Sequence, residues 1–238
     1  MAPEPDCPGS SPLVGERGAA LALVPIAATL TFYLLPAGLQ TQPAIQFIPQ
    51  LLAYGVMGLW ASQNNAALSR LGLRRAGARH GMRRGLLTGI LLGCLNTYMI
   101  LTIIPSLGYD VTFLKATPHA RLPVFVMVPW VICTIAIFVE INYRGFLLGR
   151  LSTMESLFWT SPLLQRISPL ALLISTLTFA FDPFMVNTFQ HLHWIAVWDG
   201  LIWGTILLGS GNLWITIVAH AVEVIIMYLA VRAALTAE

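Results

Sequence analysis

Charge is scarce in this chain, and that scarcity sets the class of protein. Only 10% of the 238 residues are Asp, Glu, Lys or Arg, whereas 57% are hydrophobic, and the mean hydropathy is +0.76. These values lie outside the range of an ordinary soluble domain. A transmembrane helix needs about 20 apolar residues, so the chain has room for roughly six to eight crossings. The composition predicts an all-α, polytopic transmembrane helical bundle.

Cysteine is also rare. Cys7, Cys94 and Cys133 are far apart in the sequence, and the last two lie in apolar stretches. This usage indicates neither a disulfide framework nor a thiolate metal site. We therefore expect no cofactor and no metal centre built on cysteine.

The first residues lack the features of a cleavable signal peptide. The segment "MAPEPDCPGSSPLVGERG" is acidic and rich in proline, without a basic region before a short apolar core. We interpret residues 1–18 as a polar N-terminal segment and residues 19–238 as a single membrane domain. The first span would then direct insertion.

Apolar length predicts about seven spans. The candidate segments are residues 19–37, 44–62, 85–104, 122–143, 167–184, 194–208 and 213–231.

Basic residues gather in one short segment, and this concentration indicates the orientation. Six of the thirteen basic residues fall in "SRLGLRRAGARHGMRRG", from Arg70 to Arg84. A nucleic-acid patch is one interpretation, but a basic loop between apolar runs is typical of a cytoplasmic loop, with anionic-lipid contact as an accompanying effect. We expect this loop and the N-terminus in the cytoplasm, and Arg150, Glu155 and Arg166 in a second cytoplasmic loop. The expected location is a bacterial inner membrane.

A carboxylate within a bilayer is costly and usually has a function or a compensating partner. Most of the acids are terminal or in loops. Glu140, Asp182, Asp199 and Glu223 lie in or at the ends of predicted spans, and His220 lies about two turns into the last one. These five residues are the candidates for function.

Two readings are open for Glu140. It precedes Arg144 by four residues, which is the favourable order for an ion pair on one helical face. The pair could simply neutralise itself and fix the helix, or it could take part in catalysis. His220 is equally ambiguous, because an intramembrane histidine often forms a hydrogen bond between helices.

Taken together, three segments resemble the CPBP family, which comprises the CAAX prenyl endopeptidases and bacteriocin-processing proteins. "VEINYRGFLLGRL" is similar to its first motif, EExxxRG followed by an apolar run. "LISTLTFAFDPF" looks like the helix of its FxxxH motif, and "DGLIWGTILLGSGNLWITIVAHAVEV" like its glycine-spaced helix, turn and HxxxN helix. Order and spacing agree over residues of about 120 to 230.

Departures from the family pattern fall on the residues that carry the chemistry. Val139 replaces the first glutamate, Pro183 stands four residues after Phe179 where the histidine is expected, and Val224 replaces the asparagine. Only Glu140, Arg144 and His220 are in place.

The resemblance implies a glutamate-type intramembrane peptidase. In that mechanism a carboxylate and a histidine activate a water, while a second histidine and the asparagine stabilise the oxyanion. Valine can do neither task. Asp182 and Glu223, each beside a lost position, are the residues that could rebuild the site, although a shift of one residue rotates a side chain by about 100° on a helix.

Two further features are ambiguous. His191 and His193 in "FQHLHW" could bind a metal together with Asp182, but a tryptophan-rich interfacial segment is the simpler reading. Gly200 and Gly204 form a GxxxG pattern that allows close helix packing. Asp199, just before it, could cap the helix or contact a partner protein.

Three functions therefore remain. The first is a catalytically impaired homologue that serves as a scaffold or subunit in a membrane complex, with Asp199 and Glu223 facing a partner. The second is an active endopeptidase, with Glu140 and His220 as catalytic residues, that cleaves a lipidated or membrane-embedded substrate. The third is a transporter, for which we see no inverted halves.

Overall fold

The computed structural model describes residues 16–236, and all regular structure within them is helical. Six helical segments are long and apolar enough to cross a membrane, and Ala19–Tyr33 is a shorter apolar helix. The predicted all-α bundle of about seven spans is confirmed. The six segments are Pro43–Gln63, Arg75–Ser106, Val124–Glu155, Pro162–Ala180, Pro183–Ser210 and Leu213–Leu235.

The long elements of the bundle are, in chain order, α1 (Leu23–Tyr33), α4 (Ile48–Gln63), α6 (Ala78–Tyr98), α10 (Cys133–Val139), α11 (Gly149–Glu155), α13 (Pro169–Ala180), α14 (Pro183–Phe189), α15 (Ile195–Ser210) and α16 (Leu213–Thr236). Short helices connect them: α2 (Ala37–Gln40), α3 (Pro43–Gln46), α5 (Ala67–Arg70), α7 (Ile104–Ser106), α8 (Pro118–Arg121), α9 (Val124–Val126) and α12 (Pro162–Ile167). The 3-10 turns are Ala19–Ala22, Arg75–Gly77, Thr112–Ala116 and Gln190–Trp194.

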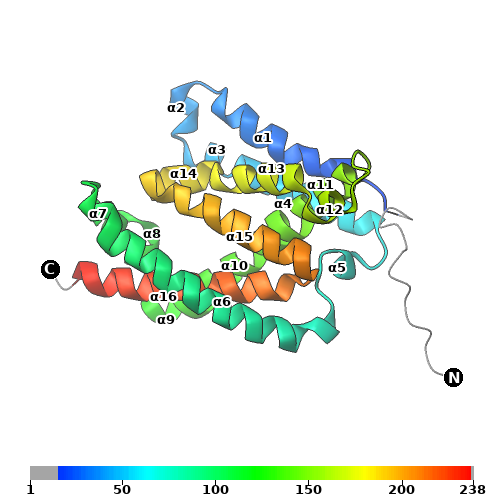
Figure 1. Ribbon diagram of the computed structural model, residues 1–238. Helices are drawn as coiled ribbons and strands as arrows, with labels where there is room; N and C mark the ends of the chain where they lie inside the picture. Colours follow the sequence, from blue (N-terminus) through cyan, green and yellow to red (C-terminus); the bar gives the residue numbers. More distant parts are fainter. Residues whose placement is uncertain (1–15, 237–238) are drawn as a thin grey trace.

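Both ends of the bundle carry connecting loops, and the arginine-rich loop marks one of them. Figure 1 shows α5, the α11–α12 connection and the turn between α15 and α16 at one end, with α2, α7, α8 and the end of α16 at the other. The turn is tied to the arginine-rich loop by Leu213 N–H, which donates to Gly72 O at 3.1 Å. The Asn212 side chain likewise donates to Gly77 O at 2.9 Å.

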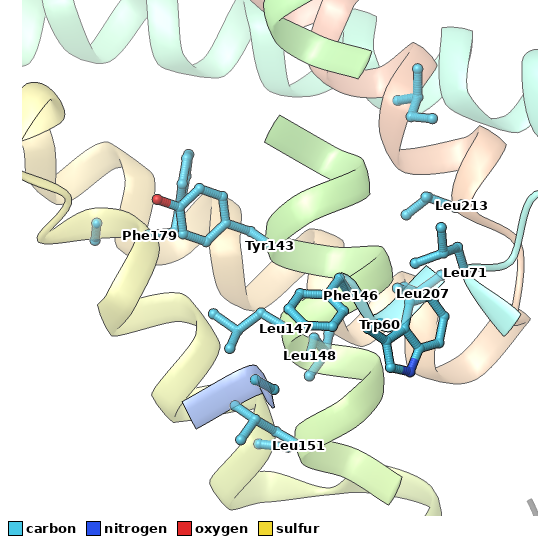
Figure 2. Packing of buried hydrophobic residues seen from close by; sticks show 14 of the residues in the cluster. Trp60, Leu71, Tyr143, Phe146, Leu147, Leu148, Leu151, Phe179, Leu207 and Leu213 are labelled. Atoms are coloured by element: carbon cyan, nitrogen blue, oxygen red, sulfur yellow. The ribbon is translucent and has the colours of Figure 1, made fainter. Parts of the chain in front are cut away.

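Helices α1 and α4 form a pair that packs against the other helices of the bundle. α1 packs against α4, and α4 contacts the helical segment Val124–Glu155, called the central segment below. Residues of all three belong to the largest cluster of buried hydrophobic residues or pack against it. Figure 2 shows Phe146, Leu147 and Leu148 within this cluster, with Trp60 of α4 and Leu207 of α15 together on the right of Phe146. Since residues 142–148 are all buried, this stretch of helix is enclosed by its neighbours and does not face lipid.

The central segment departs from α-helical geometry where the candidate site begins. Residues Glu140–Leu148 form a π-helix between α10 and α11, and shorter π-helical turns occur at Met99–Ile103 and Met127–Ile132. The turn at Met127–Ile132 contains Pro129, which cannot donate a backbone hydrogen bond. π-Helical turns occur frequently at functional sites.

Several predicted boundaries were wrong, among them the start of the sixth span, which is at Pro183 rather than residue 194. Two of the differences have a clear physical reason. The fourth span was expected to end at residue 143, but the helix continues to Glu155 and buries both Arg150 and Glu155. The helix tolerates them because each charge has a partner: Arg150 Nε lies 2.6 Å from Glu16, and the Glu155 carboxylate accepts the backbone N–H of Ala171 at 2.7 Å. The side chain of Glu16, which was expected in a polar terminal segment, is only 3% exposed.

The other correction concerns the fifth span. It was expected to run to residue 184, but α13 ends at Ala180. Asp182 stops it, because its carboxylate accepts the backbone N–H of Phe184 at 3.0 Å and so caps the next helix, α14, whose first residue is Pro183.

A stripe of glycines brings α6 and α16 into close contact. Gly81, Gly85, Gly89 and Gly93 recur every four residues along one face of α6, and all four are buried. A Cβ atom at Gly85 would lie 2.6 Å from Ile215 O, and one at Gly89 would lie 2.6 Å from Ala219 O. Side chains on this face would therefore hold the two helices apart.

This close contact can be tested with matched glycine substitutions. We expect Gly89→Ala to lower the free energy of unfolding by about 1 to 3 kcal/mol, because its Cβ would overlap α16. Gly55→Ala on α4 is the control, since no atom lies within 4 Å of a Cβ there. That variant should be as stable as the parent or more stable by up to about 1 kcal/mol, the helix-propensity difference. Thermal unfolding in detergent measures both, and equal effects would contradict the close approach.

Candidate functional site

The central segment directs adjacent side chains toward different parts of the bundle. Glu140 is fully buried, at 0% exposure, and points toward α16. Val139 packs against the large hydrophobic cluster instead. The two neighbouring positions therefore face different surroundings, as expected for residues about 100° apart around a helix.

Glu140 has two oppositely charged or polar partners. Its Oε1 atom lies 3.4 Å from the nearest guanidinium nitrogen of Arg144 and 3.0 Å from Nδ1 of His220. The Arg144 contact is close enough for an ion pair but outside hydrogen-bond geometry. The three residues that match the family motifs thus form one cluster between the central segment and α16.

Aromatic rings enclose this cluster. The Arg144 guanidinium lies 4.2 Å from the centre of the Phe179 ring and 5.2 Å from that of Trp203, so cation–π attraction adds to the ion pair. The Trp203 ring stacks on His220 with 4.6 Å between the ring centroids. These contacts fix the orientation of the Arg144 and His220 side chains.

A second polar cluster lies one helical turn further along α16. The side-chain amide of Asn96, on α6, donates to Asp199 of α15 at 3.2 Å and also to Glu223 of α16. Asn96 and Glu223 are both at 0% exposure and Asp199 is at 5%. Three helices are therefore joined by one amide. Asp199 and Glu223, which were expected to face a partner protein, lie inside the bundle.

Asp182 belongs to neither cluster. It accepts hydrogen bonds from Gln50 at 2.8 Å and from the Tyr143 hydroxyl at 3.1 Å, besides capping α14. These contacts join α4, the central segment and α14. Asp182 therefore has a structural explanation, and the structure does not bring it to Glu140.

The remaining candidates pack locally. A Cβ at Gly200 would lie 2.8 Å from Thr176, so the GxxxG face of α15 packs against α13 of the same chain. His191 contacts the rings of Tyr109 and Phe113, and His193 lies 2.6 Å from Gln190 O. Within residues 16–236, no group of three or more His, Cys, Asp or Glu side chains is arranged to hold a metal.

Several buried polar atoms of the two clusters make no hydrogen bond within the described part of the chain. They are Glu140 Oε2, both terminal nitrogens of Arg144, Glu223 Oε2 and Asn96 Oδ1. Most buried polar groups in folded proteins are satisfied by protein or water. The layer of the bundle that contains Glu140 and Glu223 is therefore a polar region of its interior.

The fold and this buried site define a polytopic helical membrane protein with an acid–base cluster in its interior. Residues 121–226 match the family model described as Rce1-like, type II CAAX prenyl endopeptidase. The match includes the Glu140–Arg144 segment, Phe179 and His220, so the resemblance seen in the sequence is confirmed over this region. No curated protein and no solved structure matches the chain.

Sequence reasoning predicted the span that carries Asn96 but missed Asn96 itself as a site residue. Asn96 lies outside the matched region, in a span with no charged residue near it. The available signal was the four-residue spacing of glycines, because Asn96 follows Gly93 by three residues and so continues the same face. No sequence pattern predicted the contact between Glu16 and Arg150, because the two residues are far apart in the chain and meet only in the folded protein.

The energetic role of the Glu140–Arg144 pair can be measured by a double-mutant cycle. We expect Arg144→Met and Glu140→Gln each to lower the free energy of unfolding by about 3 to 5 kcal/mol, because each leaves the other group buried without its partner. The double variant should lose clearly less than the sum. Unfolding in mixed detergent micelles reports these values, and additive losses would show that the two groups do not interact.

Proposed function

We propose that this protein is a catalytically silent Rce1-like membrane protein that acts as a scaffold or subunit of a membrane complex. The observation that carries the proposal is which motif residues are present and what they contact. Glu140 is enclosed by Arg144 and His220, while valine and proline occupy the positions expected to supply the chemistry. The retained residues hold helices together, and the missing ones are those that would act on a substrate.

The surroundings of the three positions that differ from the family motifs support this proposal. Val139 packs on the hydrophobic cluster, where a carboxylate would have no charged partner among the residues of that cluster. Pro183 is the first residue of α14, beyond the end of α13, so position 183 is not on the helix that carries Phe179. Val224 is next to Glu223, whose side chain already contacts Asn96.

A membrane orientation accompanies the proposal. The end of the bundle with the Arg70–Arg84 segment would face the cytoplasm, in keeping with the positive-inside rule. The α15–α16 turn is bonded to that segment and would lie on the same side. The membrane that we propose for it is the bacterial inner membrane.

One observation favours the alternative, an active intramembrane endopeptidase. Glu140 and His220 lie in hydrogen-bond contact, and a carboxylate–histidine pair can act as a general base toward water. Glu223 is one turn away on the same helix, so an acid is close to His220. In that case His220 would take a proton from water, and Glu140 would hold the imidazole in the required orientation.

Proteolysis in reconstituted membranes separates the two functions. The protein would be placed in lipid vesicles with a farnesylated peptide ending in a CAAX sequence and, separately, with a single-span peptide, and products would be detected by mass spectrometry. We expect no cleavage above that of empty vesicles. A peptidase that cleaves the same farnesylated substrate serves as the positive control.

Two variants decide the meaning of any cleavage. If cleavage occurs and is abolished in both Glu140→Gln and His220→Ala, with unfolding temperatures showing that both variants are folded, the silent assignment is wrong. Cleavage that persists equally in both variants would indicate a contaminating peptidase. Mild-detergent purification tests the subunit role directly, because a scaffold should copurify with a membrane protein in fixed stoichiometry.

A further inference from the structure

A groove opens on the bundle surface between α6 and α15, away from the acid–base cluster. Its volume is about 340 Å³. Both helices pack on α16, and Ile215 of α16 forms part of the groove's lining. The rest of the lining comes from Arg84, Leu87 and Thr88 on α6 and from Thr205, Ile206, Gly209 and Ser210 on α15.

The lining changes from polar to apolar along the groove. Arg84 is exposed, and among the described residues it takes part in no ion pair or hydrogen bond. Thr88 lies one turn further along the same face of α6, and Leu87 is 62% exposed. The groove therefore presents a cation, hydroxyl groups and aliphatic side chains next to one another.

The sequence places this groove at the boundary of the hydrocarbon region. No charged residue occurs between Arg84 and Asp110, so Arg84 is the last charge before the apolar part of α6. Ser210 ends α15 at the turn that is bonded to the arginine-rich loop. Figure 1 shows the start of α6 and the end of α15 at the same end of the bundle. A guanidinium at this depth is at the level of lipid headgroups.

We propose that this groove binds one anionic phospholipid of the adjacent leaflet. The phosphate would contact Arg84, the hydroxyl groups of Thr88 and Thr205 would bind headgroup oxygens, and an acyl chain would lie along Leu87 and Ile206. The charge fits, because the lining contains the Arg84 guanidinium and no carboxylate. A soluble phosphate would leave the apolar half of the groove exposed, so a lipid fits the lining better. Such a lipid would join α6 to α15 at this end.

Native mass spectrometry of the detergent-solubilised protein tests the site. The protein would be titrated with phosphatidylglycerol or with phosphatidylcholine of the same chain length. We expect one phosphatidylglycerol to be retained in preference to phosphatidylcholine. Arg84→Gln should weaken that binding about fivefold, the effect of removing roughly 1 kcal/mol from one interfacial cation. Arg79→Gln, an exposed arginine outside the groove, is the matched control and should change the binding little.

A second pair of variants tests the groove without changing charge. Gly209→Leu should reduce phosphatidylglycerol binding, because nothing lies within 4 Å of a Cβ there and the side chain would occupy the groove. Gly58→Leu on α4, where a Cβ also meets open space, should leave binding unchanged. Unfolding temperatures verify that both variants fold.

Several outcomes would overturn the proposal. Equal binding of the two lipids, or equal losses from Arg79→Gln and Arg84→Gln, would mean general attraction to the basic surface. Competition by soluble glycerol phosphate at the same concentration would mean a phosphate site rather than a lipid site. Since no measurement here depends on proteolysis, these outcomes are independent of the function proposed above.

Discussion

A carboxylate buried in a membrane bundle needs a partner to stabilise its charge, and the residues around Glu140 supply one. The cost of an uncompensated charge at this depth is at least a few kcal/mol. Arg144 supplies the opposite charge from the same helix, and His220 supplies a contact from α16. Because the two partners come from different elements, compensating one charge also fixes how the central segment and α16 are placed.

Close packing makes these polar contacts possible. Asn96 can reach Glu223 and Asp199 only because the glycine stripe lets α6 approach α16 at backbone distance. Between transmembrane helices the lipid provides no hydrophobic driving force, so packing and hydrogen bonds must hold them. The glycines bring the helices together, and the amide bridge then specifies their register, since a slip by one residue would remove Asn96 from both carboxylates.

Composition and apolar length were sufficient to predict the class of fold and the approximate spans. They were insufficient at Arg150 and Glu155, where charge suggested a loop but long-range partners allowed a buried helix. A single sequence shows which residues are charged but not which distant residue compensates them.

The same limit applies to the candidate site. Glu140 and Arg144 were identifiable from their spacing and His220 from the order of the motifs. Asn96 was identifiable only from the packing of α6 against α16 in the structure. Asp182, beside Pro183 where the family histidine is expected, suggested chemistry, but its contacts include those of a helix cap.

The pattern of retained and replaced motif residues follows from an asymmetry in buried charge. Removing one member of a buried pair leaves the other uncompensated, which is strongly destabilising, whereas replacing an unpaired buried charge by an apolar group is neutral or stabilising. Glu140 is in the first situation, since Arg144 and His220 depend on it. Position 139 is in the second, because it faces the hydrophobic cluster, and a carboxylate there would be retained only for its chemistry. The energetics of burial alone therefore favour keeping Glu140 with Arg144 and having valine at position 139, which is the combination present in this protein.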